Sequence, residues 1–418
     1  MQRWRPIVLV FVPFVSGYYL SYLFRTINAL ISGELTADIG IGTAELGFLT
    51  SAYFLTFALA QLPLGVLLDR YGPRRVQSAL LLVAAAGAAL FGAGHNLTAL
   101  LVGRALIGVG VAAAFMAGLK AVVLWFPKER VALVNGCFVM IGALGALTAT
   151  TPAALVLEWT GWRGLFWLLA AATAASAVLI HVVVPEMPVR PASGASGRNS
   201  LKSIYANPNF WRIAPLSTTC IGTAWALQGL WAAPWLADVA HFDQPHVVRH
   251  LFIMSVALCA GALLFGIGAD GLRRRGVRPQ TLLGLAASAL IAAQFALITG
   301  VRVPCDAMWA VIAATGGATV LSYATLAEYF PKEIAAQADA ALNILHIGGA
   351  CIIQYGIGLV VGHFATHAGH HPAVAYKTAF ALDLVLQILA LAYFASGKTG
   401  LISQWLSAAT SRAQASAS

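Results

Sequence analysis

Apolar segments of about 20 residues recur along almost the whole of this 418-residue chain. Each is long enough to cross a hydrocarbon core of about 30 Å as an α-helix. Only 10% of the residues are charged while 60% are hydrophobic, whereas an ordinary soluble domain carries about 25% charged residues. The sequence therefore predicts an all-α, polytopic membrane protein rather than a soluble globule.

Breaks at proline, glycine and clustered charge divide the chain into twelve expected transmembrane helices. The stretch "PEMPVRPASGASGRNSLKS" separates the first six from the last six, and its composition is typical of a linker. We expect two six-helix bundles at residues 1–184 and 212–398, a cytoplasmic linker at 185–211 and a cytoplasmic tail at 399–418. The expected helices cover residues 8–32, 44–66, 76–94, 99–124, 131–156, 163–184, 212–236, 247–268, 279–300, 307–327, 337–362 and 375–396.

Basic residues gather in short loops such as "DRYGPRR" and "DGLRRRG". With the N-terminus in the cytoplasm, most of the 25 Lys and Arg residues fall on cytoplasmic segments, as the positive-inside rule requires. We therefore expect a multi-pass protein of the cytoplasmic (inner) membrane with both termini in the cytoplasm. Topology accounts for the net charge of +10, so no nucleic-acid partner is implied.

Two motifs occur once in each half of the chain. "WFPKER" at 125–130 returns as "YFPKEI" at 329–334, and "GVLLDRYGPRR" at 65–75 returns in part as "GIGADGLRRRG" at 266–276. Two motifs that both recur at nearly the same offset along the chain indicate an internal duplication. The two bundles should therefore be pseudo-symmetric.

These motifs, with "GRALIGVG" at 103–110 and "GWRGLFW" at 161–167, resemble those of the major facilitator superfamily over essentially the whole chain. The resemblance implies a secondary transporter that rocks two bundles around a central site and exposes it to either side in turn. It also implies a conformational latch that is released when the bundles tilt; the alternative is that its arginines only set topology. The expected latch residues are Gly65, Asp69, Arg70, Gly72, Arg74 and Arg75, with Asp270 and Arg274 in the degraded second copy.

Polar residues follow one face of the first expected helix around Arg25. A charged side chain facing lipid costs several kcal/mol, so this face should line the protein interior or a water-filled cavity. The guanidinium is a planar fork of donors that matches a carboxylate or phosphate. No acidic residue lies mid-span in the first half, so we expect a substrate anion as its partner. The alternative is that Arg25 snorkels or binds backbone carbonyls.

The string "R-T-I-N" at 25–28 loosely resembles a pattern of the superfamily's organic anion symporters. In the second half, amide and indole side chains share faces of the seventh and eleventh helices and could supply hydrogen bonds and aromatic walls. The expected substrate-binding residues are Tyr18, Tyr22, Arg25, Asn28, Gln228, Trp231, Asn343 and Gln354.

Three residues are candidates for proton coupling. His346 titrates near neutral pH, although a histidine satisfied by a neighbour is at least as common. Arg104 matches the fourth-helix motif, and the resemblance implies that it assists proton movement. Asp383 lies mid-way along the twelfth helix, which is usually peripheral in this family, and ranks below His346. Lys120, in the inner part of the fourth helix, either faces the interior or extends to the cytoplasmic surface.

Histidines gather in two outer loops, "HFDQPHVVRH" at 241–250 and "HFATHAGHH" at 363–371. Imidazoles at such spacing can bind transition metals, so a carrier of metal ions or metal complexes is one alternative, and a sensor that binds solute without moving it is another.

The five cysteines show no CxxC spacing, which argues against a disulfide framework or metal cluster. We expect no cofactor, no enzymatic site and a monomer that interacts with a small-molecule substrate, protons and the lipid bilayer.

Overall fold

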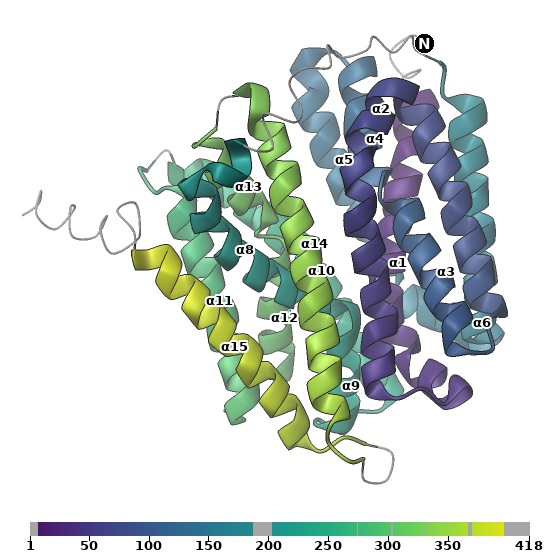
Figure 1. The fold of residues 1–418 in the computed structure, drawn as a ribbon, viewed down its shortest axis with the longest axis vertical. Helices are drawn as coiled ribbons and strands as arrows, with labels where there is room; N and C mark the ends of the chain where they lie inside the picture. The colour runs from purple at the N-terminus through teal and green to yellow at the C-terminus, as the bar shows by residue number, and fades with distance from the viewer. Residues whose placement is uncertain are drawn as a thin grey trace, which may run out of the picture.

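The computed structural model describes residues 7–186, 203–273, 275–301, 304–330, 332–366 and 370–396. These residues form long helices joined by short turns (Figure 1). The helices of the first half are η1 (Ile7–Phe11), α1 (Val12–Ile39), α2 (Thr43–Ala93), α3 (Leu97–Val111), α4 (Ala114–Trp125), α5 (Lys128–Thr148) and α6 (Thr151–Val183). Those of the second half are α8 (Pro208–Ala226), η2 (Leu227–Trp231), α9 (Ala232–Asp238), α10 (Gln244–Arg273), α11 (Pro279–Thr299), α12 (Cys305–Gly316), α13 (Thr319–Ala327), α14 (Lys332–Gly362) and α15 (Ala373–Ser396).

The helices account for the twelve expected spans. Among the described residues, nine helical stretches are long and apolar enough to cross a membrane. The 51-residue α2 holds two spans, because the chain bends at Gly72, whose φ of 78° favours glycine. A shorter apolar helix, Val134–Thr148, and the continuous segment α8–η2–α9 supply the remaining two. The predicted all-α, multi-pass architecture is confirmed.

Several helix boundaries differ from the expected ones; α6, for example, begins at Thr151 rather than at 163, and the expected helix 99–124 is divided between α3 and α4. α1 continues to Ile39 rather than ending at 32, and stops at Gly40 in the left-handed conformation. The expected helix 131–156 is interrupted at Thr150, whose ψ is −118°. Pro152 then starts α6, since proline is tolerated in the first turn of a helix. Hydropathy alone missed this break because the stretch "TATTP" at 148–152 is short and uncharged.

The helices form two groups (Figure 1). In the first, α2 packs against α3 and α6, and α1 against α5; in the second, α14 packs against α8, α10 against α12, and α11 against α15. The exact domain limits remain predictions, because residues 187–202 and 397–418, which include most of the linker and the tail, lie outside the described residues. α8 begins at Pro208, inside the expected linker.

The two groups meet tightly at one end of the molecule, between residues 43–51 of α2 and 351–362 of α14. A Cβ atom added to Gly47 would lie 3.2 Å from the Cα of Gly358, and the converse distance is also 3.2 Å. Ser51 Oγ donates to the carbonyl of Cys351 at 3.2 Å. We call this region the closed end.

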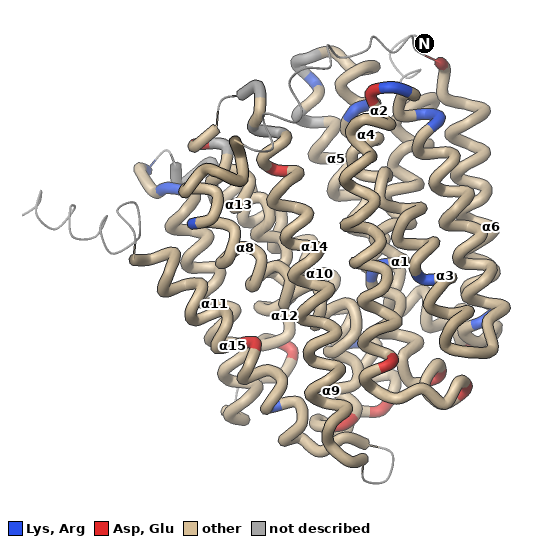
Figure 2. Tube along the Cα trace, viewed as in Figure 1, with Lys and Arg blue, Asp and Glu red and all other residues tan. Residues whose placement is uncertain are grey.

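Charge is distributed unevenly along the long axis. Figure 2 shows Lys and Arg gathered mainly at the end that carries the N-terminus, and Asp and Glu mainly toward the opposite end. The asymmetry has the form that the positive-inside rule describes. A cytoplasmic N-terminus remains a prediction.

Candidate functional site

Arg25 lies where the two halves meet. Its guanidinium carbon is 4.8 Å from the ring centroid of Tyr22 and 5.9 Å from that of Phe57. On the other side it is 4.6 Å from the ring of Trp225, in α8 of the second half. Such aromatic faces attract a cation, the more so where water is excluded. The guanidinium is therefore held at the boundary between the bundles by rings from both.

Arg25 has no carboxylate partner among the residues that the structure describes. Its Nε is buried without a hydrogen-bond partner. The tyrosines Tyr53, Tyr22 and Tyr18 interact with it, and the Tyr53 hydroxyl donates to the carbonyl of Ser21 at 3.3 Å. A buried cation without a counter-charge is costly. The guanidinium thus offers hydrogen-bond donors among aromatic rings, with no described carboxylate beside it.

Arg104 lies deeper in the first half. It is fully buried, and its Nη2 donates to the carbonyl of Phe24 at 3.0 Å. Its guanidinium carbon is 5.1 Å from the centroid of Tyr53, so both arginines contact this tyrosine. Arg104 Nε and Nη1 have no partners. The structure thus ties Arg104 to the backbone of α1; a role in proton movement stays a prediction.

The other polar residues of α1 divide between two environments. Tyr18 stacks on Phe138 at 5.1 Å and meets Tyr22 edge to face at 5.2 Å, which builds an aromatic wall beside Arg25. Asn28 is fully buried and donates to Thr50 Oγ1 at 3.0 Å. Tyr18 and Tyr22 therefore belong with Arg25, whereas Asn28 joins α1 to α2 inside the first half.

The second half contributes a facing wall. Tyr323 donates to Asn343 Oδ1 at 3.0 Å, and the His346 ring stacks on Tyr323 at 5.9 Å. His346 Nε2 is 2.6 Å from Ser217 Oγ. Tyr323 interacts electrostatically with Tyr22 and Arg25 of the first half. The structure thus places Asn343 and His346 near the Arg25 region; substrate binding by Asn343 and proton coupling by His346 stay predictions.

The remaining predicted binding residues lie toward the closed end. Trp231 donates to the carbonyl of Gln354 at 2.9 Å, and its ring touches the Gly47–Gly358 contact. Gln228 lies 3.5 Å from Ser255 Oγ. The side-chain amide of Gln354 is buried with neither polar atom bonded. Of this group, Gln354 alone offers unused hydrogen-bonding capacity, and a contact with substrate remains a prediction for all three.

Asp383 occupies a separate polar cluster within the second half. Its oxygens accept hydrogen bonds from Thr223 at 3.0 Å, Gln294 at 3.0 Å and Gln387 at 2.8 Å. The cluster joins α8, α11 and α15. These bonds give Asp383 a structural explanation that is independent of Arg25.

The predicted latch residues make their described contacts within the first half. Asp69 pairs with Lys120 at 2.6 Å, and Lys120 also donates to the carbonyl of Leu68 at 2.8 Å. Arg74 donates to the carbonyl of His181 at 2.9 Å, Arg75 pairs with Glu186, and Arg70 lies over the ring of Tyr71. Gly65 faces open space. Arg274 and the Asp270 side chain lie outside the described residues, so a latch between halves stays a prediction.

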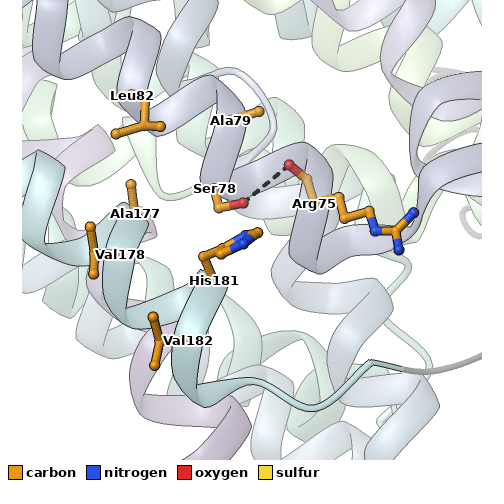
Figure 3. A pocket seen from close by; sticks show the side chains of 8 residues that line it. All are labelled: Arg75, Ser78, Ala79, Leu82, Ala177, Val178, His181 and Val182. Atoms are coloured by element: carbon orange, nitrogen blue, oxygen red, sulfur yellow. Dashed lines mark hydrogen bonds between the residues drawn. The ribbon is translucent and has the colours of Figure 1, made fainter.

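A hollow of about 420 Å³ lies between α2 and α6 near Arg75 (Figure 3). Aliphatic side chains line most of it, and Figure 3 shows the guanidinium of Arg75 pointing away from them. The polar atom of Ser78 is already bonded to the carbonyl of Arg75 at 3.2 Å. This groove therefore offers little to a polar solute, unlike the Arg25 region.

The outer histidines pair with separate carboxylates rather than with one another. His370 lies 2.8 Å from Asp238, and His250 lies 2.9 Å from Asp306. The hydrogen bond from His246 holds the pKa of the Asp243 carboxyl below its ordinary value. Among the described residues, no three His, Cys, Asp or Glu side chains gather as a metal site would require; His367 lies outside them. The metal-carrier alternative thus has no site in this part of the chain.

Several proteins are similar to this chain. It is 33% identical over 130 residues to a nitrate/nitrite transporter of a Picosynechococcus species, which covers 31% of this chain and 24% of that protein. It is 29% identical over 145 residues to a probable L-galactonate transporter of Escherichia coli, which covers 34% and 32%. These alignments thus span about a quarter to a third of each relative.

Similarity in fold covers nearly the whole molecule. The structure of a bacterial homolog of the human lysosomal transporter Spinster, solved in an inward-facing, unoccupied conformation, matches with a TM-score of 0.78 at 17% identity, over 94% of this chain and 97% of that one. The sequence model of the Major Facilitator Superfamily matches residues 14–353, which is most of the chain. The chain therefore belongs to the Major Facilitator Superfamily.

Proposed function

We propose that this protein is a secondary active transporter of a small organic anion and that Arg25 is the counter-charge for that anion. The observation that carries the proposal is the guanidinium between the halves, which has no carboxylate partner among the described residues and a buried Nε without a hydrogen bond. In a site sheltered from water, a charge-assisted, bidentate contact is among the strongest polar interactions available. Tyr18, Tyr22, Trp225 and Tyr323 would frame the organic part of the solute.

The named relatives support an anion. One is a nitrate/nitrite transporter and the other a probable transporter of L-galactonate, a sugar acid. Both descriptions favour transport over enzymatic catalysis. Because only part of each relative aligns, the substrate class of this chain rests on Arg25 as well as on those names.

Alternating access follows from the two-group architecture. The halves pack tightly at the closed end, while Asp69, next to the bend of α2 at Gly72, pairs with Lys120 of its own half. In this proposal the halves rock about the Arg25 region, and proton uptake accompanies solute movement. We expect the protein to act as a monomer in the inner membrane, with both termini in the cytoplasm.

The test is thermal unfolding of the purified protein with L-galactonate, nitrate and an alkyl sulfonate, with neutral galactose as the matched control. A solute that binds only the folded state raises the melting temperature. We expect an anion, but not galactose, to stabilise the wild type and to drive flux into proteoliposomes. Arg25→Gln should weaken binding by at least about 30-fold, because losing one partner of a buried charge pair costs about 2–5 kcal/mol.

Arg212→Gln is the control for the loss of an arginine, since Arg212 donates to the carbonyl of Phe394 at 2.7 Å within the second half. Its anion response should match that of the wild type. Equal stabilisation of wild type and Arg25→Gln by an anion would refute the role of Arg25. Binding without flux would favour the sensor, and stabilisation by a divalent metal alone would favour the metal carrier.

A further inference from the structure

The face of α14 that meets Arg25 carries a carboxyl group near the start of the helix. Asp339, Asn343 and His346 are spaced at i, i+4 and i+7, which places them on one helical face. Tyr323 of α13 lies along this face: it donates to Asn343, stacks on His346 and interacts electrostatically with Asp339. A carboxyl group, an amide and an imidazole thus share one tyrosine.

Asp339 is only partly satisfied. Its Oδ1 is buried and has no hydrogen-bond partner, and among the described residues no cation pairs with it. This differs from Asp383, whose oxygens accept bonds from three side chains. A carboxyl oxygen that accepts no hydrogen bond is free to bind a proton.

The groups around Asp339 connect it to the proposed anion site. From α13 it faces Tyr323, and Tyr323 in turn interacts with Tyr22 and Arg25 of α1. His346 lies on its own helix. α2, α8 and α15 also pack against α14, but none of their described residues places a charge on Asp339. Tyr323 is therefore the group that links Asp339 to the Arg25 region.

We propose that Asp339 is the proton-binding group that couples proton uptake to anion binding at Arg25, with Tyr323 positioned between them. When Asp339 is ionised, it competes electrostatically with an incoming anion. When it binds one proton, that negative charge is removed and one anion binds. This inference rests on the proposed function and gives it a specific coupling residue.

The sign of the pH dependence follows. Anion affinity should be highest at low pH, where Asp339 is protonated, and should fall as the pH rises through its titration. Linkage of one proton to one anion changes the dissociation constant by about tenfold per pH unit above that titration. Asp339→Asn is nearly isosteric and permanently neutral, so its affinity should be high and nearly independent of pH.

The experiment measures the binding of L-galactonate, nitrate and an alkyl sulfonate at several pH values, together with proton uptake in weakly buffered detergent solution. Wild type should take up about one proton per anion bound, and Asp339→Asn close to none. Proton-driven accumulation in proteoliposomes should be lost in Asp339→Asn while anion exchange persists. Glu158→Gln, which removes an exposed carboxyl of α6, should behave like the wild type.

Infrared difference spectra between low and high pH, recorded without solute, test the proton site by itself. The carboxylic-acid carbonyl band of the wild type should lose one component in Asp339→Asn. Unchanged spectra and unchanged proton uptake in this variant would overturn the inference, as would loss of coupling in Asp383→Asn instead. If no anion binds the wild type, the proposed function fails, while the infrared result still decides whether Asp339 titrates.

Discussion

Arg25 and Asp383 are both ionisable side chains inside the bundle, yet their surroundings are opposite. Asp383 is enclosed within one half, and three neighbouring side chains bond its oxygens. Arg25 lies between the halves, has aromatic rings around it and keeps a buried Nε unbonded. A polar group whose hydrogen bonds are made inside the protein stabilises the fold, whereas one with unused hydrogen-bonding capacity can bind a solute. The difference separates a structural polar cluster from a candidate binding site.

The largest expected effect on stability is at the Asp383 cluster. Asp383→Ala removes the acceptor that Thr223, Gln294 and Gln387 share, and a buried donor left unsatisfied costs about 1–3 kcal/mol. We expect the melting temperature in detergent to fall markedly. Asp383→Asn keeps an acceptor oxygen and should cost less than half as much. Equal melting temperatures for the alanine variant and the wild type would remove the distinction between the two regions.

Arg25→Met should have the opposite effect on stability. Replacing an uncompensated buried charge with an apolar side chain removes its desolvation cost, offset by lost cation–π contacts of about 0.5–2 kcal/mol. We expect the solute-free variant to melt at the same temperature as the wild type or higher. Arg212→Met, which removes a bonded arginine, should melt lower. A clear loss of stability in Arg25→Met would show that Arg25 is a structural residue.

The closed end offers a third test, with an expected effect of intermediate size. In Gly358→Val the new side chain would collide with the backbone of Gly47, and overpacking costs about 1–3 kcal/mol. The halves should separate there, and a thiol reagent should label Cys351 faster in a protein whose other cysteines are serine. Gly356→Val is the matched control, because a Cβ atom added to Gly356 would have no neighbouring atom within 4 Å. Slower or unchanged labelling in Gly358→Val would contradict this description of the contact.

The smallest effect is expected at Asp69. Its pair with Lys120 is partly exposed, and such pairs contribute about 0.2–1 kcal/mol. Asp69→Asn and Lys120→Gln should therefore change the melting temperature little and by similar amounts. If Asp69 also bridges the halves in another conformation, Asp69→Asn should slow transport more than Lys120→Gln does. Equal transport by both variants would remove the predicted latch.

The sequence predicted the helical spans and the polar face of α1 well, because both depend on local periodicity. Tyr18, Tyr22 and Arg25 lie together as expected, but Asn28, on the same face, bonds to Thr50 instead. Helical spacing shows which residues share a face and does not show which neighbour will cover each turn. The break at Thr150 was missed because the polar stretch "TATTP" is too short and uncharged to interrupt the hydropathy pattern.

The aromatic surroundings of Arg25 could not be predicted in full. Trp225, Tyr323, Tyr53 and Phe57 look like ordinary apolar residues of membrane helices, and contacts across the two halves determine their role. Asp339 lies only a few residues after the "YFPKEI" motif, where a carboxyl group suggests a solvated helix end. Its spacing from Asn343 and His346 was the signal that could have identified it.

The contact between Gly47 and Gly358 has a consequence for the speed of the conformational cycle. Main-chain atoms meet there directly, so no long side chain at these two positions must be ordered when the contact forms or freed when it breaks. Ordering a flexible side chain costs up to about 2 kcal/mol of entropy, and a glycine contact avoids this cost in both directions. The two helices can therefore part and rejoin at these positions with little rearrangement, which favours rapid turnover over a long-lived closed state.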